Sequence, residues 1–193
     1  MGKCMRRFSY TAAMHPKFNP RKLSVLNFAK TQASLEGVEP LAQFDRLHEF
    51  QQPGAEACEV HFQAQGEMRA TSAGASAPWL VLSASTRLTM VCQRCLGPVE
   101  EEITFEREFR FVESEAQAQI EDEEAEEDVL VLSPDFDLLE LVEDELLMDL
   151  PASPKHAVCP QPVKLRVADA DYQEPEDKPN PFAALAGLKI PKG

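Results

Sequence analysis

The sequence has no apolar run of the roughly 18–20 residues that a membrane-spanning helix requires. It also lacks an apolar segment close to Met1, so we expect no secretory signal. Its five cysteines are an odd number, and their spacing is not that of a disulfide scaffold. These absences predict a protein of a reducing intracellular compartment, the cytoplasm, without a membrane partner.

Sequence signatures of common enzymes are missing as well. The chain shows no Ser-His-Asp order, no glycine-rich loop for phosphate and no HExxH motif. Acidic residues are plentiful, but they stand in runs that are typical of solvated segments, so they do not indicate acid–base catalysis. We therefore predict that the protein is not an enzyme.

The charge of the chain is unevenly distributed. The net charge is −14 over 193 residues, yet residues 1–30 contain no acid and seven bases, which leaves −21 for the remainder. An acidic body of this kind repels phosphate and attracts basic proteins. The basic arm at 1–18 and the residues after it could instead reach nucleic acid; the candidate contacts are Arg6, Arg7, Lys17, Arg21 and Lys22. A flexible tail explains the arm equally well, and its acid-free composition weakly resembles a transit peptide.

We interpret residues 19–160 as a single α+β domain built on an antiparallel sheet. Apolar and polar residues alternate along 56–70, 79–91 and 99–112, so each segment predicts a strand with one buried face. Cys58 has the inward parity of the first strand, which predicts a buried, small apolar residue. The short connections between the three strands predict a meander that could close like a barrel.

Further elements flank this meander. Short strands are expected near 35–38 and at 128–132. Asn19-Pro20 is typical of a helix start, which predicts a short helix through Leu23, Leu26 and Lys30. The loop at 113–128 ends in E-D-E-E-A-E-E-D, and such a run is typical of a solvated, disordered segment, or of a binding site for a basic partner.

The main helix is predicted after Asp137, which can cap it, and before Pro151, which ends it. Its apolar side chains recur at helical spacing, as the stripe Leu139, Val142 and Leu146. This stripe predicts one main helix packed on the sheet. The opposite, acidic face is either solubilising or a docking surface, and its candidate contacts are Glu140, Glu143 and Asp144.

The tail at 161–193 is rich in proline and ends in P-N-P-F-A-A-L-A-G-L-K, which predicts a short helix. A helix of two turns is marginal on its own. Phe182 and Leu185 therefore need an apolar surface, on this domain or on a partner.

Two pairs of metal-ligand residues stand far apart in the sequence. Cys92 and Cys95 have a two-residue gap, and His156 and Cys159 repeat that gap after the main helix. If the helix runs back along the sheet, the pairs could meet as a Cys₃His site for one structural zinc ion, with no open position for water. A metal-free cluster of thiols remains an alternative. A redox-active dithiol is disfavoured because Leu96-Gly97-Pro98 leads into a strand and not into a helix.

Four blocks of the sequence stand out together. In order they are C-Q-R-C-L-G-P-V (92–99), D-L-L-E-L-V-E-D-E-L-L-M-D-L-P (137–151), P-K-H-A-V-C (154–159) and P-N-P-F-A-A-L-A-G-L-K (179–189). They resemble the YceD family of large ribosomal RNA subunit accumulation proteins. The resemblance implies a role in the synthesis, processing or assembly of large-subunit ribosomal RNA, and it implies no catalytic residues.

Two mechanisms fit this role. As an adaptor, the protein would hold a basic ribosomal protein or a processing enzyme on its acidic strip at 121–128 and on the face of its helix. As a direct binder, it would contact ribosomal RNA or a pre-ribosomal particle through the basic arm and Arg94. A zinc-stabilised interaction module unrelated to RNA, and a CxxC thiol oxidoreductase, are the alternatives outside this role.

Overall fold

The computed structural model describes residues 18–70, 76–122, 125, 127–161, 167, 171 and 172. The chain divides into two compact units, Met1–Cys159 and Pro160–Gly193, and the fold described below is that of the first. Within the described ranges, no helix is both long enough and apolar enough to cross a membrane. The predicted contacts Arg6, Arg7, Lys17, Phe182 and Leu185 lie outside the described residues.

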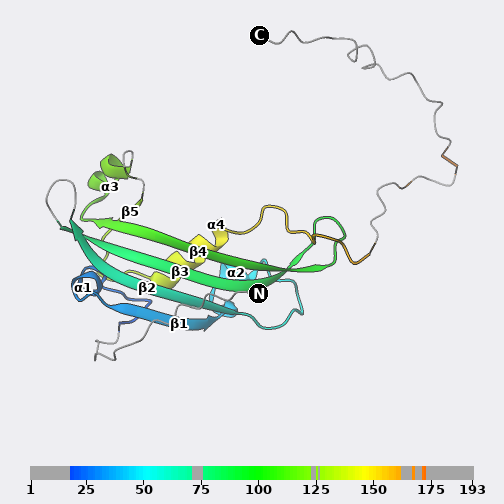
Figure 1. The fold of residues 1–193 in the computed structure, drawn as a ribbon, viewed down its shortest axis with the longest axis horizontal. Coiled ribbons are helices and arrows are strands. Elements are labelled where there is room, and N and C mark those ends of the chain that lie inside the picture. Colours follow the sequence, from blue (N-terminus) through cyan, green and yellow to red (C-terminus); the bar gives the residue numbers. More distant parts are fainter. Residues whose placement is uncertain are drawn as a thin grey trace, which may run out of the picture. The chain divides into compact units, whose positions relative to one another are not determined.

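The domain is an α+β fold on a five-stranded sheet of linear order β1-β2-β3-β4-β5 (Figure 1). The strands are β1 (Ser34–Pro40), β2 (Glu59–Ala70), β3 (Ser76–Val91), β4 (Pro98–Val112) and β5 (Asp128–Val131). The first four are antiparallel neighbours, which confirms the predicted meander. In the described chain β1 and β5 stay at opposite edges, so the sheet is open and not barrel-like.

The fifth strand runs parallel to β4, so the sheet is mixed although its first four strands are antiparallel. The physical reason is the connection, since a tight hairpin would have reversed the chain after β4. Instead a helix, α3 (Glu115–Asp122), intervenes and carries the chain back before β5 begins. The prediction of a loop over 113–128 is therefore wrong for Glu115–Asp122, which form α3, while residues 123, 124 and 126 of the run predicted to be disordered lie outside the described residues.

The remaining helical elements are α1 (Val25–Lys30), the 3₁₀ turn η1 (Leu41–Gln43), α2 (Asp45–His48) and α4 (Leu138–Met148). The Asp137 side chain accepts hydrogen bonds from the backbone N–H groups of Leu139 and Glu140, as predicted for the cap of the main helix. The predicted leucine-rich stripe of α4 is buried against the sheet, with Leu146 fully enclosed. Each such side chain contributes about 1.5–3 kcal/mol by leaving water.

The first helix begins later than the sequence predicted. The Asn19 side chain accepts from the N–H of Arg21 and forms a turn, and α1 starts only at Val25 after Ser24. Leu23 instead exchanges backbone hydrogen bonds with Phe136, at 2.8 and 3.2 Å, which holds it in an extended bridge. This pairing, at long range in the sequence, overrides the local helix signal.

Two charged residues on the polar faces of their elements are buried. Arg110 is only 8% exposed and pairs with Glu121 of α3 and with Glu127, because a guanidinium that leaves water needs carboxylate partners. Glu143 is 9% exposed and faces α2, where it accepts from the N–H groups of Arg46 and Leu47 at 2.8 and 3.1 Å. The expectation that Glu143 forms an outward acidic face with Glu140 is therefore wrong.

Cys58 also differs from its prediction. It is half-buried just before β2 begins, and its sulfur lies 3.3 Å from Nε2 of Gln51 and 3.4 Å from the carbonyl oxygen of Glu56. The inward parity extends only from Val60 onward, where the strand itself starts. A polar contact has replaced the expected apolar burial.

Candidate metal centre

The turn between β3 and β4 places two thiols on one side of a tight loop. The N–H of Cys92 donates to the carbonyl of Gly97 at 2.8 Å, and the N–H of Leu96 donates to the carbonyl of Cys92 at 2.9 Å. Leu96 has a φ of 60°, a left-handed conformation that costs a branched residue energy and that closes the loop. The sequence C-Q-R-C-L-G therefore folds back on itself at the end of the hairpin.

The second pair arrives from the segment that follows α4. Helix α4 runs opposite to β4, and the chain after it returns to the β3–β4 hairpin (Figure 1). The N–H of Gln93 donates to the carbonyl of Pro154 at 2.8 Å, which fixes this segment against the turn. His156 and Cys159 follow within five residues of that anchor. The predicted return path is the one observed.

The histidine ring is held in a defined orientation. Its Nε2 lies 2.9 Å from the carbonyl oxygen of Pro98, an atom that only accepts, so Nε2 carries the proton and donates. Its Nδ1 then has a free lone pair, and this atom lies 3.4 Å from Sγ of Cys95. A carbonyl behind the ligating imidazole is the usual support of a metal-bound histidine.

Together, the ligand atoms of Cys92, Cys95, His156 and Cys159 all lie within 4.8 Å of one another. Tetrahedral zinc with Zn–S bonds of about 2.3 Å separates neighbouring sulfurs by about 3.8 Å, so the spacing suits one such ion after a small contraction. Cys92 is fully buried and the other three residues are half-buried. The cluster can hold a metal ion with four protein ligands.

Backbone dipoles favour a thiolate at the deepest position. Burial raises the pKa of Cys92, but the N–H groups of Cys95, His156 and Arg94 point at its sulfur, and with the Cys95 side chain they lower the pKa to about 5. Burial raises the pKa of Cys159, and the neighbouring thiols of Cys95 and Cys92 raise it further. A cation among the three sulfurs would remove this mutual repulsion.

The same arrangement is unfavourable for thiol exchange. An attacking thiolate must reach its substrate, and Cys92, whose pKa is lowered, is 0% exposed. The hairpin also leads into β4, so no helix begins at the second cysteine. The geometry therefore matches a metal cluster better than a redox dithiol.

The other predicted contact residues are dispersed. Arg94 is exposed on the metal-binding turn, and Lys22 is exposed near the start of the domain. Arg21 contacts Gln43 at 3.1 Å and Asp137 at 3.5 Å, which ties it to the cap of α4. Asp144 lies 2.6 Å from Arg46, while Glu140 is exposed. The structure does not gather these residues into one surface.

Sequence reasoning missed the supporting residues of the cluster. Pro98 and Pro154 act through backbone carbonyls, and any residue type supplies a carbonyl. No residue pattern could therefore have identified them. The four candidate ligands could be recognised by the two-residue gap within each pair, and Pro98 and Pro154 show no such spacing.

Comparison with known proteins places the chain in a family. The sequence model of the family described as large ribosomal RNA subunit accumulation protein YceD matches residues 80–189, more than half of the chain and all four candidate ligands. The large ribosomal RNA subunit accumulation protein YceD of Haemophilus influenzae is 35% identical over 100 residues, which cover 51% of this chain. The match spans 58% of that relative's length. No solved structure matches. The chain belongs to the YceD family.

Proposed function

We propose that this protein supports the accumulation of large-subunit ribosomal RNA as a non-enzymatic factor. The family match carries this proposal, because it spans β4, α4 and both halves of the metal cluster. The name of the Haemophilus relative states the same role for that protein. The chain would act in the synthesis, processing or assembly of the RNA.

Within this role we favour an adaptor over a direct RNA binder. Thirty-three acids against 19 bases give a field that repels a phosphate backbone and attracts basic proteins. Direct binding would depend on Arg94 and on the basic residues at 1–30, a segment whose sequence contains no acid.

Crosslinking in cells, followed by identification of the bound RNA and protein, tests the role. Ribosomal RNA or ribosome-assembly proteins should be recovered, and recovery of neither would sink the proposal. Binding of ribosomal RNA in vitro distinguishes the adaptor mechanism from direct RNA binding. If a chain lacking residues 1–30 keeps strong affinity for ribosomal RNA, the adaptor mechanism is wrong.

We further propose that the cluster holds one structural zinc ion, bound by Cys92, Cys95, His156 and Cys159. Three thiolates and one imidazole form a donor set that zinc prefers, and they leave no position for a reacting water. Bound there, the ion would cross-link the β3–β4 hairpin to the segment after α4. Its role would be stability.

Elemental analysis with a matched pair of variants tests the metal. Wild-type protein and Cys58→Ser should contain zinc in equal amount, since Cys58 lies outside the cluster. Cys92→Ser should lose the zinc and melt at least ~5 °C lower. Wild-type protein without zinc after purification free of chelators would rule the site out.

A further inference from the structure

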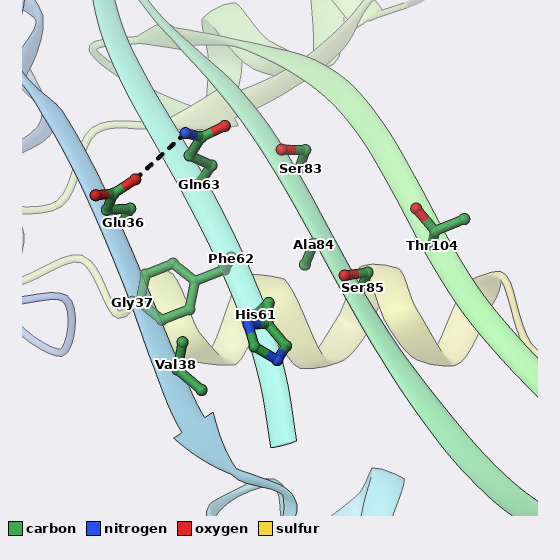
Figure 2. Close-up of a pocket in the computed structure, with 10 residues that line it drawn as sticks. All are labelled: Glu36, Gly37, Val38, His61, Phe62, Gln63, Ser83, Ala84, Ser85 and Thr104. Carbon is green, nitrogen blue, oxygen red and sulfur yellow. Dashed lines mark hydrogen bonds between the residues drawn. The ribbon is translucent and has the colours of Figure 1, made fainter. Parts of the chain in front are cut away.

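One face of the sheet carries no helix over most of its area. The side chains of Val60, Leu80 and Phe105 point to the opposite, inner face, where α1 and α4 cover them. Figure 2 shows α4 behind the strands, on the far side from the residues drawn. Among the described elements, only α3 lies on the outer face, at its end beside β5, where it holds Arg110.

A shallow hollow of about 500 Å³ lies in the centre of this outer face (Figure 2). Two cross-strand rows border it, Glu36–Gln63–Ser83 and Val38–His61–Ser85–Thr104. Its floor combines the hydroxyl side chains of Ser83, Ser85 and Thr104 with the apolar Phe62 and Ala84, so the surface is partly polar and has room for a second chain. Val38, at 50% exposure, is the one large apolar side chain on these rows.

Carboxylates surround the hollow. On its bordering rows and on neighbouring rows of the same face they are Glu36, Glu59, Glu100, Glu102 and Glu106, and Glu108 on the next row pairs with Arg69. In the described part of the chain, no Lys or Arg forms a salt bridge with any of the first five, and Glu59 lies 3.9 Å from the imidazole of His61. Arg87 is the single Lys or Arg on these rows and lies opposite Glu102 across β3 and β4.

Several described acids elsewhere in the fold share an arginine. Glu121 and Glu127 pair with Arg110, and both Glu143 and Asp144 pair with Arg46. Glu145 and Asp149 of α4 and its C-cap pair with Arg107. The charge of these six acids is therefore partly compensated, whereas the five glutamates of the outer face form no salt bridge with any described arginine.

We propose that the outer face of the sheet is the docking surface for a Lys/Arg-rich protein segment, which lies in the hollow with its cations on the surrounding glutamates. The charge and polarity of the surface select this occupant, since a phosphate backbone would be repelled and a mainly apolar helix would leave the hydroxyls of the floor without partners. The inference rests on the adaptor role proposed above and gives that role a location.

A binding experiment with two charge-matched variants tests the location. The probe is a fluorescein-labelled peptide of alternating lysine and glycine, titrated into the full chain at low and at physiological salt. The face variant is Glu36→Gln/Glu102→Gln/Glu106→Gln. The control variant, Glu49→Gln/Glu113→Gln/Glu140→Gln, removes the same charge from exposed acids outside the outer face.

We expect the face variant to weaken binding about tenfold and the control variant less than about twofold. Carbodiimide crosslinks from the peptide lysines should map to glutamates of the outer face. An equal loss in both variants would mean general attraction to an acidic protein and would overturn the proposal. Binding of an oligouridylate that weakens in the face variant would also overturn it, because the face would then take RNA.

The same variant separates this proposal from the function on which it rests. If wild-type protein recovers ribosomal proteins in cells and the face variant recovers them equally well, the docking surface is wrong while the function stands. If wild-type protein recovers no ribosomal component, the proposed function itself fails.

Discussion

At the residue scale, the domain is held together by a few charged side chains that have left water. Glu143 is the clearest example, since one carboxylate accepts from two backbone N–H groups and from the guanidinium of Arg46. Those N–H groups belong to the first turn of α2, which has no side-chain cap of its own. A glutamate 97 residues further along the chain thus supplies the missing cap.

Replacing this carboxylate should weaken the fold. We expect Glu143→Gln to lower the free energy of unfolding by about 2 kcal/mol, because the neutral amide loses the charge-assisted bonds and must turn its NH2 donor toward either the N–H groups of α2 or the guanidinium of Arg46. Glu140→Gln, on the exposed face of the same helix, should change it by less than about 0.5 kcal/mol. Urea denaturation measures both, and equal values would contradict the capping role.

At the element scale, close packing of α1 on β2 depends on one glycine. A Cβ at Gly66 would lie 2.6 Å from Cδ1 of Phe28 and 2.8 Å from the backbone nitrogen of Ala29. The N–H of Gly66 also donates to the carbonyl of Ala33 at 2.9 Å, just beyond the helix. The strand and the helix therefore touch through their backbones.

We expect Gly66→Ala to cost about 3 kcal/mol, because the backbone of α1 must move away. Gly37→Ala is the comparison, since its Cβ would meet only the far end of the Phe62 ring, at 2.5 Å, and a ring can rotate. That variant should cost about 1 kcal/mol. Thermal unfolding ranks the two, and the reverse order would refute the backbone argument.

Helix α3 should be released by acid. The bond from Arg110 and the bond from Gln117 lower the pKa of Glu121, so the detached helix binds a proton more readily than the docked one. The stabilisation of the docked helix is complete above the ordinary pKa of a glutamate, near ~4.3. It is lost as the pH falls below that value toward the lowered pKa of Glu121. NMR shifts of the Gln117 and Ala118 amides should follow this loss. In Arg110→Met the transition should disappear; if it persists, another group causes it.

Sequence patterns predicted the strands and the helix that bury one face. They missed elements whose structure depends on contacts with residues far away in the sequence. Strands β2, β3 and β4 alternate in hydrophobicity, and the stripe and cap of α4 are local, so both signals survive in the chain alone. Helix α3 was missed because its acids are typical of a solvated segment, and Arg110, which pairs with Glu121, stands on another element. The spacing of the ligand pairs was visible, whereas the carbonyls that orient them were not.

At the scale of the whole molecule, the Cys₃His cluster brings the β3–β4 hairpin together with the segment that follows α4. Removal of zinc by a chelator should accelerate hydrogen exchange of the Gln93 amide at least ~10-fold, because its bond to Pro154 depends on the joined segments. Amides in the centre of the β2–β3 ladder should keep their protection. In the Cys92→Ser variant, the Gln93 amide hydrogen should exchange rapidly whether or not a chelator is present. If the exchange rate of the Gln93 amide in wild-type protein does not change on chelation, the contact between the hairpin and the segment after α4 does not need the metal.

The long return path of α4 has a thermodynamic consequence. Cys95 and His156 are 61 residues apart, and β4, α3, β5 and α4 must all be in place before their ligand atoms meet. The affinity for the ion is then reduced by whatever fraction of chains is unfolded, and the free concentration of the ion raises the folded fraction in turn. If zinc binds as proposed, a destabilising substitution along this path will therefore present as weak metal binding, and the supply of the metal would help to determine how much of the protein is folded.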